Sequence, residues 1–303
     1  MSFKLPPQYA TLMRCLGPCE PPLAAYYTDT APENRIGPCG GFHIPMDRAG
    51  DYITAALNYS KIMKTKDDSL RCMFQFIMET RRTGVPSVFN AENFGCPGFW
   101  FYSGYLDKLP EVNHYFVSRG IPALMPGERL IPSRRSSKKS SARLEGRTPK
   151  GTHLVFEIID RINSEPEIEV VVFFANPEII TGLAGLVRFA VDNDEAVRSI
   201  YGSGCASIFA WPMQLARQGR EEAVLGVFDP AARPWLKIGE MTLAMPFGLF
   251  EKICASCKSS FMGRHHSGKS DRKKDTLFGW EDVLRRAVEY EQRMNRRKRV
   301  SRI

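Results

Sequence analysis

The sequence predicts an α/β or α+β fold in which helices pack on a mixed β-sheet built from two related or facing halves. Residues 168–175 are apolar and rich in β-branched side chains, without the alternation of a half-exposed strand, which favours a strand in the middle of a sheet. Asn176, Pro177 and Glu178 then provide a helix cap and first turn for an apolar helix to residue 191. Residues 87–102 show a similar order of strand, small-residue turn, cysteine and aromatic helix.

Composition is typical of a globular protein, with 303 residues, of which 43% are hydrophobic and 25% charged. No apolar run approaches the roughly 18 residues that a membrane-spanning helix needs, and the first residues lack the apolar core of a signal peptide. We therefore expect a cytoplasmic protein with no membrane insertion.

The first part of the chain predicts alternating helices and strands. A short helix before residue 17 precedes a strand at residues 22–28, which is rich in aromatic side chains. The helical spacing of apolar residues then predicts further helices at 51–64 and 69–82. A short strand at 87–90 and an aromatic helix from residue 99 complete this part.

The second part is expected to begin with a connecting helix at 152–162. After the strand and helix at 168–191, a helix at 207–218 tolerates Pro212 only in its first turns. Strands at 223–229 and 238–244 precede helices at 246–258 and 278–298. The last helix has a predicted buried stripe of Trp280, Val283, Leu284, Ala287 and Tyr290.

Charge divides the chain into four segments. Residues 133–150 contain seven Lys and Arg against one Glu and few apolar side chains, which predicts a basic, flexible insertion. Residues 1–132 would form the N-terminal half of one α/β domain and residues 151–258 the C-terminal half. Residues 259–303 would form a basic extension with a helix. Residues 133–150, 264–274 and 293–302 together carry +16, so the rest of the chain carries −7 of the net charge of +9.

The chain has eight cysteines, which is many for a cytosolic protein and favours metal binding, catalysis or redox chemistry. Cys96 and Cys205 each follow small residues and precede an apolar helix, whose dipole would favour the thiolate. If the two turns meet, they and Cys72 could hold a metal, an iron–sulfur cluster or a thiol-reactive substrate. Glu92 and Asn93 would be nearby polar groups. Close packing and burial explain such cysteines about equally well.

Two further patterns have simpler explanations. Cys254 and Cys257, followed by His265 and His266, resemble a zinc pair, and Cys15 with Cys19 could complete four ligands if the termini meet. The recognised zinc spacings are absent, so two neighbouring cysteines on a helix are the favoured interpretation.

The turn from Gly202 to Gly204 could cradle a phosphate at a helix start. It lacks the lysine of a P-loop and the third glycine of a dinucleotide-binding loop, so a tight packing turn is favoured. The basic segments could contact nucleic acid, but they lack interleaved aromatic residues and any recognised binding motif.

An ordered set of short motifs resembles one known family. The motifs are Arg71-Cys72, Glu92-Asn93, Cys96-Pro97-Gly98, Val170-Val171-Val172, Asn176-Pro177-Glu178, Gly204-Cys205-Ala206 with Pro212, Asp229, Arg233 and Ala244-Met245-Pro246. Over Glu20 to Ile253 the chain is similar to the domain-of-unknown-function 169 family of archaea and anaerobic bacteria. This resemblance implies that Cys72, Cys96 and Cys205 occupy family positions and connects the chain with anaerobic metabolism, but it implies no reaction.

The leading hypothesis is a small ligand, metal or iron–sulfur cofactor bound between the halves. Its expected binding residues are Cys72, Glu92, Asn93, Cys96, Gly202, Gly204 and Cys205, and the sequence leaves catalysis open. The alternative is a non-enzymatic protein that engages an anionic partner through its basic segments.

Overall fold

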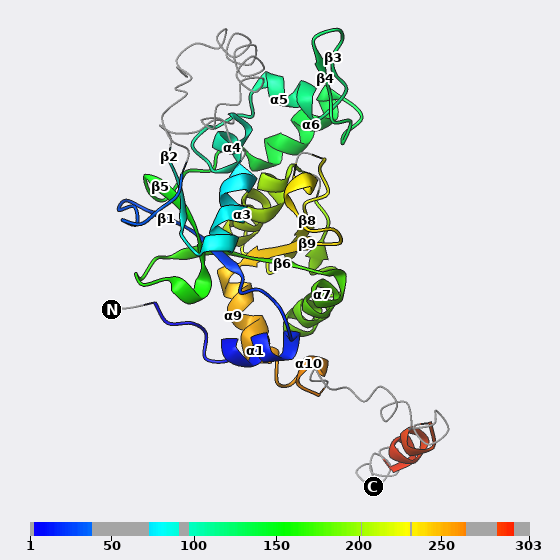
Figure 1. Ribbon diagram of the computed structural model, residues 1–303. Helices are drawn as coiled ribbons and strands as arrows, with labels where there is room; N and C mark the ends of the chain where they lie inside the picture. Colours follow the sequence, from blue (N-terminus) through cyan, green and yellow to red (C-terminus); the bar gives the residue numbers. More distant parts are fainter. Residues whose placement is uncertain are drawn as a thin grey trace.

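A seven-stranded mixed sheet runs through the middle of the molecule, with the strand order β2-β5-β1-β6-β9-β8-β7 (Figure 1). The computed structural model describes residues 3–37, 73–90, 97–200, 202–230, 232–264 and 284–293. The strands of the sheet are β1 (Leu23–Thr28), β2 (Ser87–Asn90), β5 (His153–Ile158), β6 (Ile168–Ala175), β7 (Val197–Arg198), β8 (Ala223–Gly226) and β9 (Met241–Pro246). Neighbouring strands are antiparallel except β7 and β8. The α+β prediction is confirmed.

The strand β6 lies at the centre of this sheet, as predicted, and every one of its residues is buried. Its side chains alternate between two hydrophobic clusters, with Val171 and Phe173 in one and Val172 and Phe174 in the other. Because helices cover both faces of the strand, it reads as a continuous apolar run in the sequence.

Helices cover both faces of the sheet, as Figure 1 shows for the lower and upper parts of the molecule. One cluster joins the sheet to α1 (Tyr9–Leu16), α7 (Pro177–Val191), α9 (Phe247–Ser256) and α10 (Phe261–Arg264). The other joins it to α3 (Met73–Thr83), α4 (Pro97–Tyr102), the π-helical turn η4 (Ala206–Ala210) and α8 (Trp211–Arg217). The predicted cap of α7 is confirmed, since the Asn176 side chain accepts a hydrogen bond from the N–H of Ile179 at 3.0 Å.

The predicted helix at 152–162 is wrong, because this segment forms β5 and then the short 3₁₀ turn η3 (Ile159–Arg161). The strand lies between β2 and β1, with Leu154 and Phe156 on one face and Val155 on the other. An apolar run buried on two faces cannot be distinguished from a buried helix by its periodicity alone.

The basic segment 133–150 is folded against the body rather than flexible. It forms α6 (Arg134–Ser141), capped by Ser133, and the 3₁₀ turn η2 (Ala142–Leu144). A small outer unit beside it comprises α5 (Glu111–Phe116) and a hairpin of β3 (Gly120–Ile121) and β4 (Met125–Pro126).

Arg147 is only 2% exposed and holds this basic segment in place. It donates hydrogen bonds to the carbonyls of Phe101 (2.6 Å), Tyr102 (2.9 Å) and Leu144 (2.6 Å). The buried positions of α6 are the serines Ser137 and Ser141. The side chains that hold the segment against the body are therefore polar. The prediction of a flexible insertion, which relied on the low apolar content of the segment, did not identify them.

Residues 284–293 are helical, but all of them are exposed. The predicted buried stripe is wrong for Leu284, Ala287 and Tyr290, of which Leu284 is 58% and Tyr290 64% exposed. Trp280, Val283 and the helix predicted at 51–64 lie outside the described residues. A short remaining turn, η5 (Arg233–Trp235), follows β8.

Candidate functional site

A cavity of about 90 Å³ lies where α3, α4 and α5 meet the turn before η4 and the loop after β8. Its lining combines aromatic rings with polar and acidic side chains. The lining residues are Phe74, Gly98, Phe99, Tyr102, Asn113, Phe116, Val117, Glu128, Ser203, Gly204, Cys205, Asp229 and Ala232. Residues from both expected halves of the chain therefore form its walls.

The turn at Gly202–Gly204 needs glycine at both ends because neighbouring side chains approach its backbone closely. A Cβ atom on Gly204 would lie 2.4 Å from the ring of Phe74, and one on Gly202 would lie 2.5 Å from the Cβ of Ala206. The backbone N–H of Gly204 is directed at the Asp229 carboxylate. A phosphate would compete with that carboxylate, so the geometry favours the packing turn over the phosphate cradle.

Ser207 joins this turn to the loop after β8. Its hydroxyl donates to the carbonyl of Gly204 at 3.0 Å and accepts from the N–H of Val227 at 3.2 Å. Val227 is a β-branched residue with φ +63°, a strained conformation that costs on the order of 1–3 kcal/mol. The fold thus holds a strained backbone two residues before Asp229, next to a π-helical turn of the kind often found at functional sites.

Asp229 is 3% exposed and forms part of the cavity wall. Burial raises the pKa of its carboxyl group, although hydrogen bonds from the backbone N–H groups of Gly204, Asp229 and Ala232, and the nearby charge of Arg233, act in the opposite direction. Desolvation is the largest of these effects. Its Oδ1 atom has no hydrogen-bond partner within the protein.

Three residues of this lining each have a buried side-chain oxygen atom without a protein hydrogen-bond partner. These atoms are the Oδ1 atom of Asp229, the Oδ1 atom of Asn113 and the Oγ atom of Ser203. A buried polar atom without a partner costs about 1–3 kcal/mol, and native proteins contain few of them. Ordered water, or a bound molecule that supplies hydrogen-bond donors, would satisfy these atoms.

Cys205, like Gly204, is a predicted site residue that lines this cavity. It is half-buried and follows Gly204 at the start of the helical segment that continues into η4. Cys72, Glu92, Asn93 and Cys96 lie outside the described residues. Gly98, two residues after Cys96 in the sequence, lines the same cavity.

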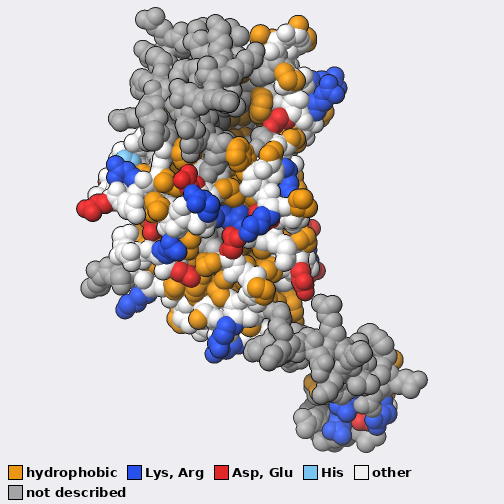
Figure 2. All heavy atoms as spheres, in the orientation of Figure 1, with side chains coloured by type: hydrophobic (Ala, Val, Ile, Leu, Met, Phe, Trp, Pro, Cys, Tyr) orange, Lys and Arg blue, Asp and Glu red, His pale blue; other side chains and the backbone are white. Residues whose placement is uncertain are grey.

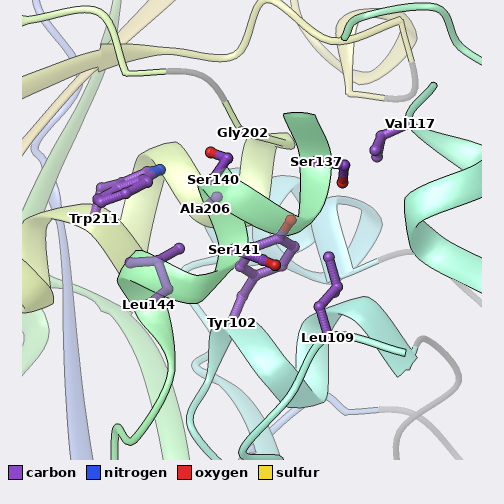
Figure 3. A pocket seen from close by; sticks show the side chains of 10 residues that line it. All are labelled: Tyr102, Leu109, Val117, Ser137, Ser140, Ser141, Leu144, Gly202, Ala206 and Trp211. Carbon is purple, nitrogen blue, oxygen red and sulfur yellow. The ribbon is translucent and has the colours of Figure 1, made fainter. Parts of the chain in front are cut away.

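A second, smaller gap adjoins this cavity and shares Tyr102 and Val117 with it. Figure 3 shows the serines of α6 between the Trp211 side and the Val117 side of this gap. Its volume of about 10 Å³ is close to the minimum for one water molecule. Ser137 is also engaged with Nδ1 of His114 at 2.8 Å, so we assign this gap to packing of α6.

A larger groove of about 1,000 Å³ runs along α7. Its walls are mainly apolar, from Ile179 to Phe261 and Met262, and its Asn176 side chain is used by the α7 cap. None of the partnerless buried oxygen atoms in the described residues belongs to a residue of its lining. It therefore gives a weaker indication of a polar ligand.

Three of the cysteines considered as zinc ligands lie in the hydrophobic core, which agrees with the favoured interpretation that Cys254 and Cys257 are neighbours on a helix. Cys254, Cys257 and Cys15 are buried in the cluster formed by α1 and α9, with Cys15 beside Cys257. Burial raises the pKa of Cys254 and of Cys257 to about 12, which keeps both thiols protonated. No group of three metal-binding side chains occurs in the part of the chain that the structure describes. His265 and His266 lie outside that part.

Acidic partners within the fold engage many of the basic residues of 133–150. Glu111 pairs with Lys138 and Arg134, and Lys150 pairs with Glu169 at 2.7 Å. Arg143 lies over the ring of Trp211, 4.6 Å from its centre. Elsewhere on the molecule, Figure 2 shows Lys and Arg side chains next to Asp and Glu side chains in the middle of the face that it draws. In the described ranges no helix is long and apolar enough to cross a membrane.

Sequence reasoning named Gly204 and Cys205 as site residues and missed three others. Asp229 was noted for the family resemblance, and its position at the end of a predicted strand was the available signal. Ser203 lies inside the predicted turn. Asn113 has no distinguishing pattern in the sequence, because only the packing of α5 brings it to the cavity.

A scan against protein-family models matches residues 11–256 to the domain-of-unknown-function 169 family, described as "Uncharacterised ArCR". No curated protein and no solved structure matches the chain significantly.

Proposed function

Since the chain belongs to the domain-of-unknown-function 169 family, whose description names no activity, we propose from its own geometry that it binds a small polar organic molecule. The binding site would be the cavity between α3, α4, α5 and the turn at Ser203–Cys205. This proposal refines the expectation of a ligand held at cysteine-bearing turns.

The observation that carries the proposal is the set of three partnerless oxygen atoms of Asn113, Ser203 and Asp229. The cavity of about 90 Å³ has room for roughly six water-sized groups. Ordered water could satisfy the same oxygen atoms, so the test must distinguish a specific ligand from solvent.

The surrounding structure supports a preformed site. Phe74 and Phe99 form rigid, buried walls, each 1% exposed, while Phe116 is 38% exposed. Such a combination of apolar walls and a few directed polar groups is typical of small-molecule sites. The thiol of Cys205 would lie beside the ligand and could report on its presence.

A metal or iron–sulfur cofactor is the alternative from the cysteine pattern. It would require Cys96 to join Cys205, and metal analysis with an absorption spectrum of anaerobically purified protein tests it. The anionic-partner alternative is less favoured, because Glu111, Glu167 and Glu169 already pair with basic residues of the 133–150 segment.

The direct test combines ligand-observed NMR with alkylation of Cys205 by iodoacetamide, measured by mass spectrometry of the peptide. The full-length protein would be screened against small amines, alcohols and carboxylic acids. We expect at least one compound to bind and to slow alkylation of Cys205. Asp229→Asn should weaken that binding, whereas the exposed control Asp194→Asn should not. Screening in which no compound binds or protects the thiol would contradict the proposal.

A further inference from the structure

We infer that the molecule bound in the Asp229 cavity is a small primary amine in its ammonium form. This inference rests on the proposed function and adds the chemical class of the ligand. Its lining includes Asp229, Asn113 and Ser203, each of which has a buried side-chain oxygen atom without a protein partner. Aromatic rings form other parts of the same lining.

Hydrogen-bond counting supports a ligand that is rich in donors. An ammonium group has three N–H donors and no acceptor. The Oδ1 atoms of Asn113 and of ionised Asp229 only accept hydrogen bonds, and the hydroxyl oxygen of Ser203 can also accept one. The donors of an ammonium group therefore match these acceptors in number. A carboxylate or phosphate ligand would bring further acceptors next to the Asp229 carboxylate, which itself can only accept.

The charges around the cavity favour a cation. Asp229 lines it, and although the charge of nearby Arg233 acts on this carboxylate, the described lining itself contains no Lys, Arg or His. The buried carboxylate of Asp229 has lost hydration, as the raised pKa of this group indicates. A cation inside the cavity would offset that cost, whereas an anion would increase it.

The aromatic walls add a second, independent preference for a cation. Phe74, Phe99 and Phe116 line the cavity, and the faces of aromatic rings attract ammonium groups. The same rings offer apolar contact to a short alkyl chain. With room for roughly six water-sized groups, the cavity fits an amine of a few carbon atoms.

Three probes of equal length separate charge from shape. At neutral pH, n-propylamine is a cation, n-propanol is neutral and propionate is an anion. Binding of each to the full-length protein would be measured by NMR titration, with protection of Cys205 from iodoacetamide as the second readout. We expect n-propylamine to bind at least tenfold more tightly than n-propanol and propionate to show no binding.

Two variants of the cavity test the role of the carboxylate. Asp229→Asn should weaken n-propylamine binding at least tenfold while changing n-propanol binding by less than threefold. Asn113→Asp adds a second carboxylate and should tighten n-propylamine binding at least threefold. This second variant keeps the inference testable if Asp229→Asn does not fold.

The outcomes distinguish the inference from the function on which it rests. If n-propanol or propionate binds as tightly as n-propylamine and protects Cys205, the cavity is a ligand site but the amine assignment is wrong. If n-propylamine binds equally well to wild type and Asp229→Asn, the cation lies elsewhere and the inference is also wrong. If none of the three probes binds, the amine assignment fails, and the wider compound screen alone decides the proposed function.

Discussion

Replacing Arg147 by alanine should destabilise the protein far more than replacing its exposed neighbour Arg143. Arg147 donates three hydrogen bonds to backbone carbonyls at 2.6 to 2.9 Å while it is 2% exposed. Hydrogen bonds from a charged donor contribute about 1.5–3 kcal/mol each. Burial opposes this gain, since it lowers the pKa of Arg147 to about 10 from 12.5, which corresponds to roughly 3 kcal/mol.

The hydrogen bonds outweigh the cost of burial, so Arg147→Ala should lower the free energy of unfolding by about 2–5 kcal/mol. Arg143→Ala loses only an exposed contact with the Trp211 ring and should cost less than about 1 kcal/mol. Urea unfolding followed by circular dichroism measures both values. If the two variants lie within about 0.5 kcal/mol of each other, Arg147 does not anchor the basic segment, and the reasoning is refuted.

Three further predictions address the turn, the buried acid and the core thiols. Gly204→Ala places a Cβ atom 2.4 Å from a buried ring and should lower stability by about 1–3 kcal/mol, whereas Gly248→Ala, with nothing within 4 Å, should gain up to about 1 kcal/mol; similar melting temperatures for the two variants would contradict this. The raised pKa of Asp229 means that its contribution to stability is fully present below about pH 4, the unfolded value, and is lost as pH rises through the folded value. The Asp229→Asn variant has no carboxyl group to ionise, so its free energy of unfolding relative to wild type should increase from pH 4 towards pH 7 in urea titrations. If the difference in free energy between the two proteins does not change with pH, the raised pKa of Asp229 is wrong. Cys257 is fully buried, while Cys19 is half-buried. In the native protein, iodoacetamide should therefore modify Cys19 before Cys257, which should react only at the rate of unfolding. Equal rates of modification at the two cysteines would contradict this prediction.

Much of the fold could be predicted because its local signals agree with its tertiary packing. The strand β6 and helix α7 combine a buried apolar run with a strong cap at Asn176, and the structure has both. The failures occurred where packing overrides local pattern. β5 resembles a helix because it is buried on two faces, and α6 seemed unstructured because its anchors are serines and Arg147.

The candidate site was only partly visible in the sequence. Small residues before a helix marked Gly204 and Cys205, since close packing demands glycine there. Asn113 and Asp229 are separated by more than a hundred residues, and only the completed sheet and α5 bring them to one cavity. No pattern local to either residue carries that information.

The position of β5 in the sheet has a consequence for how the chain acquires its structure during synthesis. β1 lies between β5 and β6, and β2 pairs with β5, so both early strands need partners that are made more than sixty residues later. Such distant pairing slows folding and leaves strand edges exposed while the ribosome completes the chain. A nascent chain that ends at residue 132 has β1 and β2 without β5 or β6, and it should require a chaperone or aggregate until residues 153–175 emerge.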